Sequence, residues 1–297
     1  MPRAVLAVAA ALVFASCVDG PDVATTTSAV VDPGAFTLPA LGDAERAAIV
    51  GKYDALDPDD IVPRGLLEDA IVYYDVNQDL IPKHAYMAVI DLSLYSGKDR
   101  FWLVDLASGV VEPHKVAHGD GSDPDNDGYA TLFGNVDGSH MSSLGFYLSG
   151  EIYDGTHPHS MRVDGLSADG SPNDMANTNV RDRLIVVHEA SYVDDGNTSQ
   201  QGRSNGCFAL DPGIEADVVD RIHDGTLMYS ATSPLNPPVG RGGAPDGSGS
   251  GDGMGPADQP GDPAADANGG CASGGGGNGP LVFVFLIVLL IALRRWR

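Results

Sequence analysis

Residues 202–210 read Gly202-Arg203-Ser204-Asn205-Gly206-Cys207-Phe208-Ala209-Leu210, and they hold the one cysteine that lies away from the ends of this 297-residue chain. The other two cysteines are not natural disulfide partners, because Cys17 closes an N-terminal apolar run and Cys271 lies in a Gly-rich tail. A lone buried thiol is often a small apolar core residue. In a glycine-flanked loop that follows a histidine, however, it is a candidate nucleophile.

A strand-like segment with a histidine at its end precedes this loop. Residues 183–188 form an apolar run that predicts a buried strand, and His188 at its end can project into a cleft. Cys207 follows 19 residues later, after a polar loop that allows the chain to return. An adjacent imidazole, together with the N-terminus of a helix from about Pro212, raises the thiolate fraction of a thiol whose ordinary pKa is about 8.5. Gly206 permits a tight turn and leaves nearby amides to bind an oxyanion.

The rest of the chain between the two ends predicts a mainly β domain. Helices are predicted from Asp43 to Asp54, after Pro63, and from Asp211 as cap to Gly225 as terminator. Short runs rich in β-branched or aromatic residues, separated by turn residues, predict strands at 86–92, 101–106, 110–117, 144–152, 160–163, 183–188 and 226–229. We therefore expect one domain over residues 38–232, a β-sandwich or barrel with a few helices.

The motifs resemble those of the cysteine L,D-transpeptidases of bacterial peptidoglycan. Ser-x-Gly-Cys after a His-ending strand is typical of their catalytic motif, and the resemblance covers about Tyr86 to Tyr229. Further segments follow in the order seen in the murein L,D-transpeptidase catalytic-domain subfamily: Phe101–Leu106, Val116–Gly119, Ser142–Tyr147, Arg162–Leu166 and Asn173-Asp174. The resemblance implies acyl transfer on peptidoglycan stem peptides without a cofactor or a catalytic metal. It also implies acylation of the cysteine by carbapenems.

The resemblance implies a role for each residue of the catalytic motif. Cys207 would be the nucleophile and His188 the base, and the backbone around Asn205, Gly206 and Cys207 would form the oxyanion hole. Ser204 would brace the loop. These roles require the thiol, the imidazole and the loop amides to lie together, which is an expectation for the fold.

Two positions depart from the family pattern. Glu189 stands where glycine is common, so either its carbonyl or its carboxylate is expected to orient His188. An arginine that often follows the cysteine is missing, and Arg203 is the nearest cation that can hold a substrate carboxylate. His118 is a weaker substrate-binding candidate with a structural role as its alternative. Arg162 is likewise either a substrate contact or a residue of a solvated strand face.

Two rival functions stay open at this point. The first is a wall-binding module that has kept the fold and lost turnover, with Glu189 marking the loss, although intact Cys207 and His188 argue against it. The second is a secreted cysteine peptidase that acts on ordinary proteins. Assays on stem peptides and on casein-like substrates separate these classes from a transpeptidase or L,D-carboxypeptidase.

The N-terminus predicts export. Residues 1–17 contain Arg3, an apolar run and Ala15-Ser16-Cys17, which is typical of a lipoprotein signal with Cys17 as the lipidated residue. Phe14 stands where leucine is usual, so plain signal-peptidase cleavage stays open. Residues 18–37 are predicted to be a spacer.

The C-terminus predicts attachment to the envelope. Residues 233–279 form a linker rich in Gly, Pro and Asp, and residues 280–297 form a hydrophobic segment with a basic end. Its apolar run of 13 residues reaches roughly 20 Å, against a hydrocarbon thickness of about 30 Å. The run therefore favours a processed sorting segment over a membrane anchor. Together with Cys271 it resembles the Cys-containing sorting tails of myxobacterial type.

The charge and the acidic turns narrow the partners. The chain has 41 acidic and 17 basic residues and a net charge of −24, which disfavours nucleic acid and suits an exported, periplasmic or surface-attached protein. Contact with a membrane is expected only through the lipid or the tail. Residues 123–128 resemble the opening of a calcium loop, but its twelfth position is Gly134 rather than glutamate. An acidic turn is the favoured interpretation.

Overall fold

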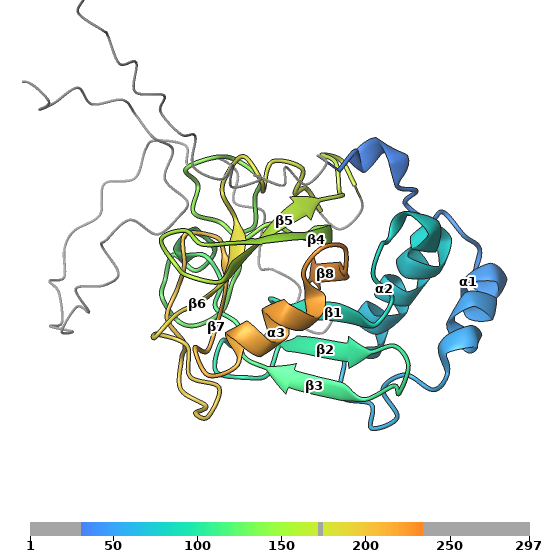
Figure 1. The fold of residues 1–297 in the computed structure, drawn as a ribbon, viewed down its shortest axis with the longest axis horizontal. Helices are drawn as coiled ribbons and strands as arrows, with labels where there is room; N and C mark the ends of the chain where they lie inside the picture. The colour runs from blue at the N-terminus through green and yellow to red at the C-terminus, as the bar shows by residue number, and fades with distance from the viewer. Residues whose placement is uncertain (1–30, 172–174, 234–297) are drawn as a thin grey trace, which may run out of the picture. The chain divides into compact units, whose positions relative to one another are not determined.

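The structure is a computed structural model that describes residues 31–171 and 175–233 (Figure 1). The predicted export signal, the C-terminal segment, Cys17, Cys271 and Asn173-Asp174 lie outside the described residues, as does most of the predicted linker. In the part of the chain that is described, no helix is both long enough and apolar enough to cross a membrane.

Eight strands in the described residues form one mixed sheet, in the order β3-β2-β1-β8-β4-β5-β6-β7. The strands are β1 (Tyr86–Asp91), β2 (Phe101–Asp105), β3 (Val111–His114), β4 (Gly145–Tyr153), β5 (Ser160–Gly165), β6 (Val186–Glu189), β7 (Phe208–Leu210) and β8 (Leu227–Ala231). Neighbouring strands are antiparallel except for two parallel pairs, β1 with β8 and β6 with β7. His188 and Glu189 lie on β6, and Cys207 directly precedes β7.

The two edges of the sheet meet just after β3. The Ala117 amide donates to the carbonyl of Ala209 in β7 at 2.9 Å, and Gly119 forms a second bridge with Ser204. These bridges join the segment that follows the edge strand β3 to the other edge strand, β7, and to the loop before β7. The sheet is therefore a nearly closed barrel, which confirms the predicted mainly β class and selects the barrel over the sandwich.

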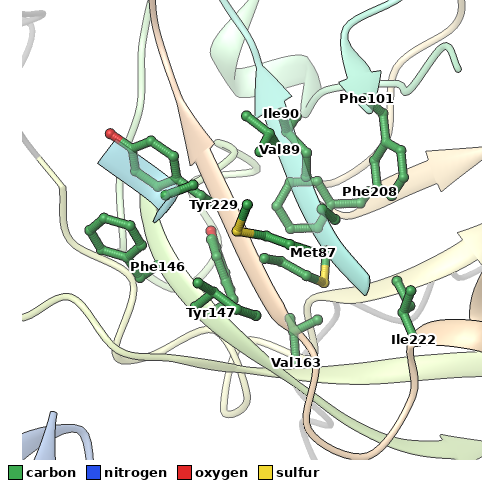
Figure 2. Packing of buried hydrophobic residues seen from close by; sticks show 14 of the residues in the cluster. Met87, Val89, Ile90, Phe101, Phe146, Tyr147, Val163, Phe208, Ile222 and Tyr229 are labelled. Carbon is green, nitrogen blue, oxygen red and sulfur yellow. The ribbon is translucent and has the colours of Figure 1, made fainter. Parts of the chain in front are cut away.

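The interior of the barrel is filled by aliphatic and aromatic side chains (Figure 2). Phe146 stacks between Tyr73 and Tyr229, with ring centroids 3.7 and 4.3 Å away. Phe208, the residue after Cys207, is 1% exposed and meets Tyr147 edge-to-face at 5.4 Å. Because burying a large side chain stabilises a fold by about 1.5–3 kcal/mol, Phe208 fixes the start of β7 and the thiol before it.

Three helices occur in the described residues: α1 (Asp43–Val50), α2 (Arg64–Asn77) and α3 (Glu215–Ile222). Figure 1 shows α1 beside α2. The predicted helix from Pro212 begins later, at Glu215, because the Asp211 side chain accepts the Gly213 amide at 2.5 Å and forms a turn first. Asp211 bonds the first amides of this turn, in line with its predicted role as the cap, and the predicted effect of the helix N-terminus on the Cys207 thiol stays a prediction.

The predicted spacer is partly packed against the barrel. Phe36 stacks on Tyr73 of α2 with ring centroids 6.4 Å apart. The Thr37 amide donates to Asn77 Oδ1 at 2.7 Å, and Asn77 Nδ2 returns a bond to the Thr37 carbonyl at 2.9 Å. The packed body therefore begins before Leu38, the predicted boundary.

Candidate active site

The candidate base lies on β6, and the candidate nucleophile directly precedes β7, the strand that pairs with β6 in parallel. The register pairs Val187 with Phe208 and His188 with Ala209. Continued by one residue, it sets Cys207 beside Val186, which shares a sheet face with His188 because side chains alternate along a strand. Cys207 is 3% exposed and His188 is 4% exposed. The register thus indicates that the two buried side chains share one face of the sheet, and direct contact between the thiol and the imidazole stays a prediction.

His188 is held by the backbone of the next residue. Its Nδ1 lies 2.7 Å from the Glu189 carbonyl oxygen. Since a carbonyl can only accept, Nδ1 carries the proton and Nε2 is left as the basic nitrogen of the neutral ring. Of the two predicted arrangements for Glu189, the structure has the carbonyl and not the carboxylate.

Burial keeps this imidazole neutral. Desolvation, followed by the charge of His157, lowers the pKa of His188 to about 4, and the hydrogen bond to Glu189 opposes the shift. The His157 ring stacks on His188 with centroids 4.1 Å apart and planes inclined by 25°. At neutral pH His188 is therefore a base and not an imidazolium.

The loop before Cys207 is braced by a serine hydroxyl. Ser204 Oγ donates to the Cys207 carbonyl at 2.8 Å and accepts from the Gly206 amide at 3.1 Å. The predicted bracing role of Ser204 agrees with these bonds. The Gly206 amide is thereby engaged by the Ser204 hydroxyl, and the oxyanion hole predicted around Asn205, Gly206 and Cys207 stays a prediction.

His118 is an interior residue rather than a cleft residue. It is 0% exposed, accepts from Arg100 Nη2 at Nδ1 (2.8 Å), and directs Nε2 to Asp123 Oδ2 (3.3 Å). Burial, then the charges of Arg100 and Arg203, lower its pKa to about 2. Its carbonyl accepts the Ser204 amide at 2.9 Å. Of the two predicted roles of His118, the structure favours the structural one, because a fully buried ring has no surface left for a ligand.

Arg203 lies beside the acidic turn. Its Nη1 donates to the Asp123 carbonyl at 2.5 Å. The Asp123 carboxylate accepts the amides of Asp127 and Gly128 at 3.1 and 3.0 Å, so the turn closes on itself. Among the described residues there is no group of three or more His, Cys, Asp or Glu side chains that could hold a metal ion.

Arg162 lies on β5 opposite Val186 of β6, and hence on the same face as His188. Its guanidinium lies 4.4 Å from the ring centroid of Tyr153, and its Nε lies 3.3 Å from Glu151 Oε1. Its side chain keeps 28% exposure. The residue is therefore packed but partly open to solvent, next to the candidate base.

The match to known proteins spans most of this barrel. The profile of the L,D-transpeptidase catalytic domain matches residues 60–230. The chain belongs to this family. No curated protein matches the chain.

Several solved structures are similar to this L,D-transpeptidase domain. An L,D-transpeptidase from Mycobacterium smegmatis is 12% identical over 50% of this chain and 59% of its own, with a TM-score of 0.31. One from Stackebrandtia nassauensis is 13% identical over 65% and 81%, with a TM-score of 0.30. The helical cell shape determining protein Pgp2 from Campylobacter jejuni is 14% identical over 52% and 49%, with a TM-score of 0.31. The chain spans less than two thirds of the length of the mycobacterial and Campylobacter proteins.

Two residues around the site of this L,D-transpeptidase domain escape sequence reasoning. His157 reaches His188 from the β4–β5 hairpin, and no spacing rule links a hairpin tip to a strand end elsewhere in the chain. Arg100 resembles a turn residue because Gly97, Lys98 and Asp99 precede it. A charged residue directly before an apolar strand is the one weak signal that Arg100 offered.

Gly206→Ala should destabilise this L,D-transpeptidase domain by about 1–3 kcal/mol. Gly206 has φ 108°, and an added Cβ would lie 2.8 Å from the Met141 carbonyl oxygen and 3.0 Å from Ile185 Cδ1. Gly138→Ala is the matched control, because Gly138 also has a positive φ (71°) but open space around it. Chemical denaturation measures both variants. Equal losses would show that the contacts around Gly206 are unimportant.

Proposed function

We propose that this protein is a peptidoglycan L,D-transpeptidase that works through a thioester on Cys207. The observation that carries the proposal is the hydrogen bond from His188 Nδ1 to the Glu189 carbonyl, on the strand paired with the one that follows Cys207. This hydrogen bond leaves Nε2 of His188 without a proton. Nε2 lies on the face that His188 shares with Val186, the residue that the register sets beside Cys207. Membership of the family supports a stem-peptide substrate.

The chemistry divides between the two side chains. His188 Nε2 takes the thiol proton as Cys207 Sγ attacks the carbonyl carbon of the meso-diaminopimelyl residue, in the amide bond that joins this residue to the terminal D-alanine. The Asn205 and Cys207 amides stabilise the developing oxyanion. The protonated His188 then gives its proton to the leaving amine of the terminal D-alanine, and a thioester remains. An amine of a second stem forms a cross-link, whereas water gives L,D-carboxypeptidase activity.

The pKa of His188 indicates when the proton moves. Burial lowers the pKa of His188 to about 4, so its neutral ring is a weak base. In the proposed mechanism the thiol proton therefore moves to Nε2 during attack. A substrate carbonyl close to Sγ is required before the thiolate forms.

Arginines near the site are proposed to hold the substrate carboxylate. Arg203 donates one hydrogen bond to the Asp123 carbonyl. Because a guanidinium has five N–H donors, Arg203 can bind a substrate carboxylate as well. Arg162 adds a partly exposed cation on the His188 face. His118, being buried, has no part in this proposal.

The location follows from the substrate. Peptidoglycan lies in the cell envelope, so the proposed activity requires export. The export signal predicted over residues 1–17, with Cys17, and the sorting segment predicted over residues 280–297 support this location. Attachment to a membrane through lipid or tail is part of the same proposal.

Mass spectrometry of a disaccharide-tetrapeptide incubated with the purified protein tests the function. Cross-linked dimers, or loss of the terminal D-alanine, are the expected products. Cleavage of casein without either product would indicate the peptidase. Binding to purified cell-wall sacculi without turnover would indicate the wall-binding module.

The rate of acyl transfer should fall with an acid midpoint near pH 4. The base must be unprotonated, and a lowered pKa of about 4 keeps His188 unprotonated down to that pH, so activity is lost as the pH falls through 4. A profile of kcat/KM against pH measures this, with circular dichroism at each pH as the control for folding. His188→Gln should remove the limb together with most of the rate. A limb near the ordinary histidine value of about 6.5 would contradict the buried neutral base.

A further inference from the structure

A second histidine covers the face of the proposed base. His157 lies between β4 and β5, and its ring stacks on His188 with a centroid separation of 4.1 Å. The two planes differ by 25°, so the contact is face to face rather than edge-on. Nothing in the mechanism above uses this ring.

The hairpin that carries His157 is tied down on two sides. The His157 carbonyl accepts the Ser160 hydroxyl at 2.8 Å, at the start of β5. His159 Nε2 lies 3.0 Å from Asp220 Oδ1 on α3, and the His159 amide donates to Asp154 Oδ1 at 3.2 Å. His157 is therefore presented by an anchored turn, and its position does not depend on the stack alone.

The contact supplies what the single hydrogen bond to His188 lacks. A bond from Nδ1 to the Glu189 carbonyl fixes one edge of the ring, but the terminal torsion of a histidine is broad and leaves the plane free to tilt. A ring stacked on one face removes that tilt. With both restraints, Nε2 keeps one direction.

We propose that His157 is a positioning residue that holds the plane of the His188 imidazole, so that Nε2 stays directed at the Cys207 thiol. The charge of His157 also contributes to the lowered pKa of His188. The proposal rests on the proposed function for its kinetic effect. The titratable and charged groups on the His188 side are His157 on the hairpin, Cys207 before β7, and Arg162 of β5 with its partner Glu151, and the Glu189 carbonyl bonds the ring from its own strand.

Two substitutions separate the ring from the charge. His157→Ala removes both, and should lower kcat about two- to tenfold, the range that one aromatic stack supports, with little change in KM. His157→Phe keeps a stacking ring without a charge, and should retain kcat while the acid limb of the pH profile moves to higher pH. Thr156→Ala is the matched control on the same turn, because Thr156 is exposed and its substitution leaves the stack of His157 on His188 and the His159–Asp220 contact in place.

A readout without turnover keeps the inference independent of the proposed function. In NMR titrations of the full chain, the His188 ring signal is assigned by its loss in His188→Gln. Its midpoint should rise in both His157 variants and stay constant in Thr156→Ala. Alkylation of Cys207 by iodoacetamide should slow in His157→Ala but not in His157→Phe. An unchanged midpoint and an unchanged alkylation rate in His157→Ala would overturn the inference, even in a protein that turns over stem peptides. If the His157 variants show these shifts and the wild type does not turn over stem peptides, the proposed function alone is refuted.

Discussion

Cys207→Ala should abolish both cross-linking and removal of the terminal D-alanine. In the proposed mechanism the sulfur forms the thioester, and the one hydroxyl of the Ser204–Cys207 loop, that of Ser204, is bonded to the Cys207 carbonyl. Loss of the covalent step should lower turnover by several orders of magnitude, to the detection limit. Mass spectrometry of stem-peptide products measures the change.

The fold should survive this substitution. Cys207 is 3% exposed, and truncating one small buried side chain costs about 1 kcal/mol, whereas the neighbouring Phe208 keeps β7 anchored in the core. Circular dichroism and denaturation provide the control. The family resemblance further implies a carbapenem adduct on the peptide that contains Cys207 in the wild type and not in the variant. Unchanged turnover by folded Cys207→Ala would end the thioester mechanism.

Local patterns predict most strands but not the closure of the barrel. Alternation and turn residues locate β1 and β2 to within a residue at each end, since their signals are local. The bridges from Ala117 to Ala209 and from Gly119 to Ser204 join segments far apart in the chain, and no periodicity encodes them. β7 was missed because it has three residues and directly follows the catalytic motif.

A backbone conformation displaced the predicted start of the strand that carries His188. The predicted strand from Arg183 starts at Val186, because Leu184 has φ 57°, a left-handed conformation that interrupts a strand. The Leu184 carbonyl instead lies 3.9 Å from Cys207 Sγ. An apolar run thus concealed a bend that brings backbone to the thiol, and propensity alone does not predict a positive φ at leucine.

The candidate site was predictable where chemistry dictates residue type. A thiol and an imidazole at strand ends drew attention to Cys207 and His188, and the structure places them on paired parts of the chain. His118 was ambiguous because its burial depends on a partner, Arg100, that the sequence does not connect to it. A role that depends on burial, such as that of His118, can be predicted only once the fold is known. A role that depends on the reactivity of the residue type, such as that proposed for Cys207, can be predicted from the sequence.

Arg100 is a buried charge that bonds His118, the residue whose carbonyl accepts the amide of Ser204 in the loop before Cys207. It is 0% exposed and donates to the Val116 carbonyl through Nε (2.9 Å) and Nη2 (2.6 Å), to the Leu94 carbonyl (2.9 Å), and to His118 Nδ1 (2.8 Å). Burial lowers its pKa to about 9, opposed by Asp91 and Asp123, so it remains charged at neutral pH.

Arg100→Met should therefore destabilise the protein by about 3–5 kcal/mol, the cost of breaking a buried charged network from one side. The substitution keeps an unbranched chain but leaves two carbonyls and the His118 ring without their donor, and it leaves Asp91 without the opposing charge. Urea denaturation measures the free energy of unfolding. Arg221→Met is the control, since Arg221 pairs with Glu112 at 2.7 Å on the surface and a surface pair contributes about 0–1 kcal/mol.

The same variant connects the core to the catalytic loop. His118 receives the Arg100 hydrogen bond on its ring and accepts the Ser204 amide on its carbonyl, so a displaced His118 should loosen the residues just before Cys207. Iodoacetamide should then alkylate Cys207 at a changed rate in folded Arg100→Met and at the wild-type rate in Arg221→Met. If Arg100→Met costs no more than the surface control, the buried arginine is dispensable, and the bridges at Ala117 and Gly119 hold the loop without it.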